Sequence, residues 1–161
     1  MDKGKNTKHD MHTSHYKQLI MMAVLSFICM YILMYAMVNS IGNVIPNINQ
    51  FYMAGLMTMP MIIIEIVVMR GMYMDRKLNL GIMGLAALGL VAFFLCIRQQ
   101  AAVSERQFLK SMIPHHAGAI LMCEHANIKD PEIKTLCASI DASQQQEIEQ
   151  MKTWLRTKYH R

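Results

Sequence analysis

Three segments of the chain are almost entirely apolar, and they cover residues 19–40, 51–69 and 78–97. Apart from tyrosine and cysteine, their only ionisable side chain is Glu65. A membrane-spanning helix needs about 20 apolar residues at a rise of about 1.5 Å each, and all three segments reach that length. A buried helix of a soluble protein would show polar residues at helical spacing, and these segments do not. The pattern therefore predicts three transmembrane helices.

Beyond residue 97 the pattern becomes that of amphipathic helices. We expect a first helix to continue from the third span or to restart near Ser104, because apolar residues recur at three- and four-residue steps. Pro114 lies inside this run and predicts a bend. Residues 127–130 are typical of a turn, and the sequence Asp-Pro-Glu at 130–132 starts a second helix. Aspartate caps the helix, proline fits its first position, and glutamate complements its dipole.

These elements predict an all-α fold in three regions. The regions are an N-terminal tail over 1–18, a three-helix transmembrane region over 19–97 and a helical hairpin domain over 98–161. Two helices alone enclose only a small core. We therefore expect the hairpin to pack against another copy of the chain, as a homo-oligomer, or against the membrane part.

The distribution of charge predicts the orientation in the lipid. Hydrophobic residues make up 53% of the chain and charged residues only 17%, against about 25% in an average soluble domain. The segment 39–50 carries no charge, whereas the tail and the second loop carry Lys3, Lys5, Lys8, Lys17, Arg70, Arg76 and Lys77. Positive flanks stay in the cytoplasm, so we place the N-terminus there and the C-terminal domain outside. The net charge of +5 is spread over the flanks and the tail, so nucleic acid is not expected as a partner.

The hairpin contains residues with the spacing of metal ligands. Met112, His115 and His116 stand at steps of three and four residues, which places them on one side of a helix. Neutral imidazole is the commonest metal ligand in proteins, and thioether sulfur favours Cu(I) over harder ions. Met122 and, on the facing helix, Met151 extend this set. In the alternative interpretation, the histidines form hydrogen bonds across a small bundle and the methionines fill its core.

Two motifs of the C-terminal hairpin region resemble a known family. The first is Glu-x-x-Phe-x-x-x-Met-Ile-Pro-His-His at 105–116, and the second is Gln-x-Glu-Ile-x-x-Met-x-x-Trp-Leu at 145–155. Together they resemble the bacterial domain of unknown function 305 family. The resemblance implies a ferritin-like helical hairpin or bundle that is usually exported or membrane-anchored, with copper handling in some members. It implies no enzyme activity.

The resemblance also implies a set of site residues. Carried over residue by residue, they are Met112, His115, His116, Met122, Glu147 and Met151. The family commonly has aspartate three residues before the phenylalanine, where this chain has Glu105. The carboxylate is thus retained on a longer side chain, with a role in orienting a histidine.

Three further features carry candidate chemistry. His9, His12 and His15 cluster in the tail, and short histidine-rich tracts bind metals, so they form a candidate weak cytosolic site. Glu65 is an intramembrane carboxylate, which is costly and serves either packing or function. Two methionine ladders, over 30–37 and 53–61, give either a thioether path for Cu(I) or Ag(I) or adaptable apolar filling.

Two of the four cysteines lie on the facing helices of the predicted hairpin. Cys123 and Cys137 face a compartment in which disulfides form. A turn centred near Ile128 would place them about one helical turn out of register, which argues against a disulfide. Either one is an alternative soft ligand near His116.

The sequence thus predicts a membrane-anchored metal-binding protein of the bacterial inner (plasma) membrane, with a periplasmic or extracellular hairpin. It would capture or hand over Cu(I) or Ag(I) together with other envelope metal-handling proteins. Met112, His116 and Met151 are the expected ligands, and Glu105 or Glu147 would hydrogen-bond the second imidazole nitrogen. The alternatives are a metal-free structural module and a small transporter subunit that uses Glu65. No catalytic residues are predicted, because the chain lacks a nucleotide loop, a nucleophile elbow and a CxxC pair.

Overall fold

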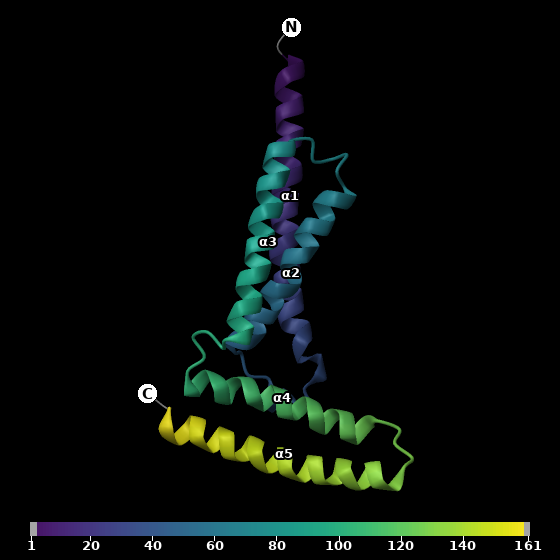
Figure 1. Cartoon of the computed structure of the whole chain (residues 1–161), viewed down its shortest axis with the longest axis vertical. Coiled ribbons are helices and arrows are strands. Elements are labelled where there is room, and N and C mark those ends of the chain that lie inside the picture. Colours follow the sequence, from purple (N-terminus) through teal and green to yellow (C-terminus); the bar gives the residue numbers. More distant parts are fainter. Residues whose placement is uncertain (1–2, 160–161) are drawn as a thin grey trace. The chain divides into compact units, whose positions relative to one another are not determined.

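The structure is a computed structural model that describes residues 3–159, with side chains described from residue 15 onward. Every regular element in this part of the chain is helical, which confirms the all-α prediction. The elements in chain order are α1 (Lys3–Leu33), η1 (Met34–Met37), η2 (Ile41–Asn43), α2 (Ile48–Val68), α3 (Arg76–Arg98), α4 (Glu105–His125) and α5 (Pro131–Lys158). Figure 1 shows these helices coloured along the chain.

The chain divides into two compact units. The first, called here the three-helix unit, comprises residues 1–32 and 51–101 and contains most of α1, α2 and α3. The second, called the hairpin unit, comprises residues 33–50 and 102–161. The connection between the first two spans therefore belongs to the same unit as the C-terminal hairpin, which the sequence did not indicate.

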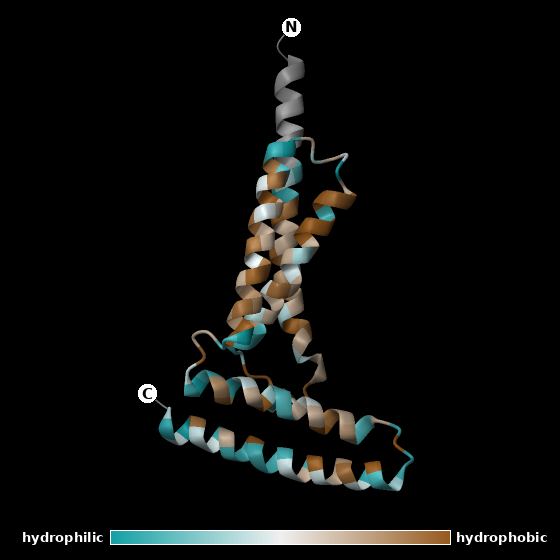
Figure 2. Cartoon of the chain, in the orientation of Figure 1, coloured by the Kyte–Doolittle hydropathy of each residue, from teal (hydrophilic) through white to brown (hydrophobic). Residues whose placement is uncertain are grey.

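Three helices are long and apolar enough to cross a membrane, over His15–Met37, Ile48–Val68 and Arg76–Arg98. Figure 2 shows them as mostly brown, hydrophobic ribbons, whereas α5 is largely hydrophilic. Their large side chains stay exposed: Leu80, Leu85 and Leu88 on α3 each expose about 70% of their surface. Apolar surface of this extent does not stay in water, so it requires lipid or another chain around it.

The three-helix unit is held by a few side-chain contacts between the spans. Leu19 of α1, Ile66 of α2 and Tyr73, just after α2, are buried in one cluster. Farther along the spans the ring of Phe51 lies 5.1 Å from Phe27 and 6.3 Å from Phe93, measured between centroids. In the most apolar window of α2, 28% of the residues are buried, against 6% in α1 and α3. The second helix is thus the most enclosed of the three.

Glycines allow close approach between α2 and α3. A Cβ atom built on Gly55 would lie 2.5 Å from the ring of Phe93, and one built on Gly89 would lie 2.8 Å from the sulfur of Met59. Without a hydrophobic driving force in lipid, small residues that admit a neighbour's side chain are the usual basis of helix packing. Gly55 and Gly89 serve this purpose here.

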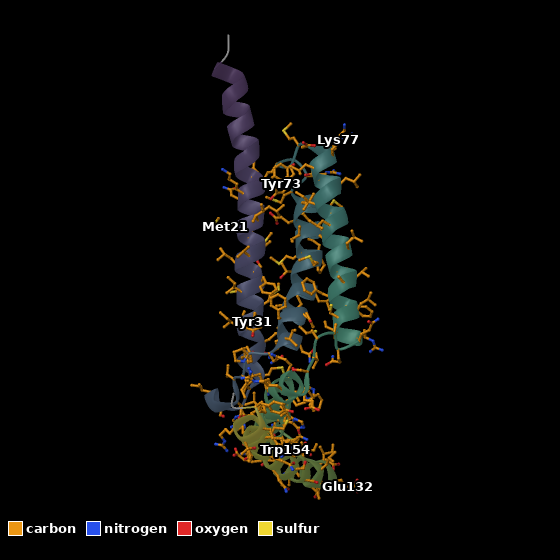
Figure 3. The ribbon with its side chains drawn as sticks, turned by 90° about the vertical axis from the view of Figure 1, so that its left-hand side faces the viewer. Met21, Tyr31, Tyr73, Lys77, Glu132 and Trp154 are labelled. Atoms are coloured by element: carbon orange, nitrogen blue, oxygen red, sulfur yellow. The ribbon has the colours of Figure 1, made fainter. Side chains whose placement is uncertain are left out.

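A polar cluster near the loop between α2 and α3 includes Glu65, the carboxylate of the second apolar helix. The Tyr73 hydroxyl donates to Glu65 over 3.5 Å, and the Tyr16 hydroxyl donates to the Asn79 side chain over 2.8 Å. Burial and the charge of Glu65 raise the pKa of Tyr73 above its usual value. Figure 3 shows Tyr73 at the end of the unit where Lys77 also lies. Glu65 therefore has a polar partner on the adjoining loop.

In the hairpin unit, α4 and α5 run side by side (Figure 1), and their contact encloses the core. Ile113, Ile120 and Ile148 are its fully buried side chains. Val38 and Ile45, from the segment between the first two spans, pack against the same core. The 33–50 segment thus supplies additional packing for the hairpin core, for which the sequence predicted another copy of the chain or the membrane part.

Hydrogen bonds fix this segment onto α4. The Gln107 side chain accepts from the backbone N–H of Ile48 over 3.2 Å, and the Asn49 amide donates to the Ser111 hydroxyl over 3.2 Å. Asn47 is buried, and its side chain accepts from the backbone N–H of Gln50 at the start of α2. The segment is thus an ordered part of the hairpin unit with its own side-chain caps.

The ends of α4 and α5 follow the predicted signals. The polypeptide leaves α3 through left-handed backbone at Gln100 and Ala102, and α4 restarts where the Ser104 side chain caps it. Asp130 caps α5 by accepting from two backbone N–H groups, with proline at the first helical position. The proline in α4 leaves the helix continuous from Glu105 to His125, because only one ladder bond is lost and the buried face packs on both sides of it.

Replacing Gly55 by alanine tests the close approach of α2 to α3. The added methyl group would collide with the Phe93 ring, and overpacking of this kind costs about 1–3 kcal/mol. We expect Gly55→Ala to lower the thermal unfolding midpoint of the detergent-solubilised protein, followed by circular dichroism. Gly84→Ala is the matched control because nothing lies within 4 Å of its added Cβ. Equal midpoints for the two variants would contradict this packing.

Candidate metal site in the helical hairpin

The pairing of α4 with α5 sets which side chains face each other. His116 of α4 pairs with Glu147 of α5, and the Tyr159 hydroxyl donates to Glu105 near the other end of the hairpin. These contacts define an antiparallel register. Met112 precedes His116 by one turn, and Met151 follows Glu147 by one turn, so the two methionines fall in the layer next to the His116–Glu147 pair.

His116 is held at both ring nitrogens. Its side chain is largely buried, at 8% exposure for the residue. Nδ1 lies 2.8 Å from the backbone carbonyl of Met112, and Nε2 lies 2.8 Å from Oε2 of Glu147. A carbonyl oxygen only accepts, so Nδ1 carries a hydrogen. Nε2 is thereby the nitrogen that faces α5 and whose lone pair becomes available when the imidazole is neutral.

The two methionines nearest to this pair belong to the hairpin core. Met151 is 6% exposed and lies in the cluster with Ile113 and Ile148, and Met112 packs against that cluster. Each thioether therefore sits in apolar surroundings beside a polar pair. The structure thus brings Met112, His116, Glu147 and Met151 into one region of the hairpin.

The other residues predicted for the site lie elsewhere. His115 is exposed, and its ring centroid is 6.1 Å from that of His116 with the planes at 80°. Met122 exposes 54% of its surface and is outside the core cluster. Glu105 accepts from Tyr159, and this hydrogen bond is the main cause that raises the pKa of the Tyr159 hydroxyl. Of the two carboxylates proposed to orient an imidazole, it is therefore Glu147 that contacts one.

The remaining metal candidates lie outside the hairpin. The side chains of His9 and His12 fall outside the described residues, and the described His15 has a buried Nδ1 without a hydrogen-bond partner. Among the side chains that the structure describes, no group of three or more histidine, cysteine or carboxylate residues could hold a metal ion. A site in the described part of the chain therefore has to include thioethers or fewer ligands.

The two hairpin cysteines are both free thiols and line one open cavity. Hydrogen bonding to Cys137, burial and the charges of Cys137 and Asp141 raise the pKa of Cys123 to about 11. The loop between the helices is extended at both ends, at Ala126 and Asp130. In the register set by the His116–Glu147 pair, Cys137 lies about one helical turn from the position opposite Cys123, which agrees with the offset expected from the sequence.

The C-terminal region matches a known family, and most of the chain is similar to a known protein. Residues 97–161 match the model of the Domain of unknown function (DUF305). The chain is also 35% identical over 140 residues to the uncharacterized protein L153 of Acanthamoeba polyphaga mimivirus, covering 85% of this chain and 90% of that protein. This similarity extends well beyond the hairpin into the apolar helices. No solved structure matches the chain.

Removal of the Glu147 carboxylate tests the polar pair in the hairpin. Glu147→Leu leaves the buried Nε2 of His116 without a partner, and we expect a loss of about 1–2 kcal/mol in the free energy of unfolding. Trp154 on α5 is the only tryptophan of the chain, so its fluorescence during urea denaturation reports the hairpin unit. Glu149→Leu is the control, because Glu149 forms only an exposed pair with Lys152 at 3.8 Å. A loss no larger than in the control would show that the pair contributes nothing.

Proposed function

This chain belongs to the DUF305 family, and from that premise we propose that it is a membrane-anchored protein that captures Cu(I) or Ag(I) in its C-terminal hairpin. The ligands are the Nε2 atom of His116 and the thioether sulfurs of Met112 and Met151. The role is binding and transfer of the ion, without catalysis. We place the hairpin on the outer face of the membrane, which in a bacterial cell is the periplasmic or extracellular side.

The observation that carries the proposal is the anchoring of His116. Its Nδ1–H donates to the backbone carbonyl of Met112 over 2.8 Å, which fixes the ring and its tautomer and directs Nε2 toward α5. Histidine ligands of metals commonly have their second nitrogen held in this way by a carbonyl or a carboxylate. The anchor is a backbone atom of the same helix, so it does not depend on any mobile side chain.

The chemistry of the neighbouring side chains favours a soft, monovalent ion. Thioethers are soft ligands that select Cu(I), and imidazole accompanies them in mixed sites. Met151 lies in the core cluster and Met112 packs against it, and a neutral sulfur atom costs little to bury there. A harder divalent ion would require several carboxylates or additional histidines, whereas among the described side chains Glu147 is the carboxylate paired with His116.

Glu147 makes the binding of the metal ion reversible. Its side chain is 52% exposed, whereas that of His116 is only 10% exposed, so the carboxylate is the partner that can turn toward water. The metal and the carboxylate compete for the same ring nitrogen. A protein that accepts the ion therefore has a route in which Glu147 returns to Nε2 as the metal leaves.

Anaerobic Cu(I) titration against a chromophoric chelator tests this site. We expect the variant Met112→Leu/Met151→Leu to bind at least tenfold more weakly, because leucine keeps the core volume but removes the sulfur ligands. His116→Gln should show a similar loss. The fold of each variant is checked by Trp154 fluorescence.

Met122→Leu and His115→Gln serve as matched controls for the titration. Both residues are exposed and lie outside the core, so their replacement should leave the affinity within about twofold of the original. Equal affinity of the core and control variants would exclude a thioether–imidazole site in the hairpin.

A second candidate function is structural. In the absence of metal, both nitrogens of His116 face acceptors, which matches a protonated imidazole bridging α4 and α5. The His116–Glu147 pair would then be a structural ion pair that fixes the register of α4 against α5. This function predicts that His116→Gln loosens the hairpin in metal-free buffer and that no specific Cu(I) binding is detected.

Glu147→Gln separates the two functions. An amide binds a protonated imidazole more weakly than a carboxylate, by about 1 kcal/mol. Loss of this competition should raise the Cu(I) affinity about fivefold if Nε2 is the ligand. A lower affinity would instead mean that the carboxylate supports the metal, with Nδ1 rather than Nε2 as the ligating nitrogen.

A further inference from the structure

We propose that Cys123 and Cys137 form a second site for a soft monovalent cation, Cu(I) or Ag(I), at the turn end of the hairpin. The site is separate from the thioether–imidazole site and uses two thiolates as its ligands. It goes beyond the proposed function, because nothing in that function uses either cysteine.

The two thiols come from different helices and line the same cavity. Cys123 lies on α4, Cys137 lies on α5, and both border the cavity at the turn end of the hairpin. Both are partly buried, and both are free. A metal–thiolate bond is about 2.3 Å long, so an ion between two sulfur atoms holds them about 4.6 Å apart. We expect rotation of the two side chains to bring the sulfur atoms to that separation inside the shared cavity.

The surroundings differ from those of a cysteine that merely fills a core. No cysteine belongs to the core cluster of the hairpin. Instead the two thiols line an open cavity of about 240 Å³ whose wall includes the charged side chains Glu124, Lys134 and Asp141. An ion from solution therefore has access to both sulfur atoms.

The number of ligands selects the class of ion. In the described part of the chain no three histidine, cysteine or carboxylate side chains are arranged around one point, whereas structural zinc requires four ligands. Two thiolates satisfy a soft monovalent ion, which thiolate sulfur prefers. The site therefore fits Cu(I) or Ag(I) and does not fit zinc.

Binding exchanges protons for the metal without any redox change. Two S–H bonds break, two metal–sulfur bonds form, and both protons pass to water. The product carries one negative charge, which the ammonium group of Lys134 in the same cavity wall offsets. Glu124 and Asp141 lie on that wall as well, and their carboxylates attract the incoming cation before the thiols are deprotonated.

The test is anaerobic titration of the reduced, full-length protein in detergent with Cu(I). The stoichiometry is read by native mass spectrometry, and the ultraviolet absorption of Cu(I)–thiolate bonds is recorded in parallel. We expect Cys123→Ser/Cys137→Ser to lose one equivalent of metal and the thiolate absorption. Cys29→Ser/Cys96→Ser is the matched control, with both cysteines in the membrane-spanning helices, and it should keep both.

Further variants separate this site from the thioether–imidazole site. Met112→Leu/His116→Gln should retain the thiolate absorption, so that failure of one site leaves the other measurable. Cys123→Ala/Cys137→Ala, checked by Trp154 fluorescence, guards against a folding defect of the serine variant. Retention of the thiolate absorption in the cysteine double variants would overturn the proposal. So would a reduced protein whose Cys123 and Cys137 bind no Cu(I).

Discussion

The antiparallel packing of α4 against α5 is the constraint on which the rest of the candidate chemistry depends. Ile113, Ile120 and Ile148 are fully buried between the helices and define their register, because a shift by one turn would expose them. With that register fixed, His116 pairs with Glu147, and Cys123 and Cys137 line one cavity. The same apolar contact that stabilises the hairpin thus creates two places where ligating atoms from different helices come together. A change in the core would therefore alter both.

A two-helix hairpin has too little core to be stable by itself, and here a third segment completes it. The connection between the first two spans packs Val38 and Ile45 on the hairpin core, and the side chains of Gln107 and Ser111 bind its backbone or side chains. This connection and the hairpin therefore form one compact unit. The hairpin thus depends on a segment that lies between two of the apolar helices in the sequence.

The three-helix unit is packed differently from the hairpin, because its helices are apolar on nearly all sides. Its outward side chains remain exposed, and its contacts rely on small residues and aromatic rings, as with Gly55 beneath Phe93. Glu65 accepts a hydrogen bond from the hydroxyl of Tyr73. This contact gives the carboxylate a specific partner in the packing of the unit. Met53 and Met57 of the second methionine ladder are exposed, which is the position of side chains that face lipid.

The sequence by itself determined the all-α class, the three apolar helices, and the starts of α4 and α5 at Ser104 and Asp130, because these depend on local periodicity and capping. It also indicated which residue types of the hairpin suit a soft metal ion. Only the tertiary structure decided which of those residues meet. The helix register decides three features. His116 pairs with Glu147 in place of Glu105, His115 and Met122 are exposed, and Cys123 and Cys137 line one cavity. That register is set by long-range packing and by an extended loop, and neither leaves a periodic signal in the sequence.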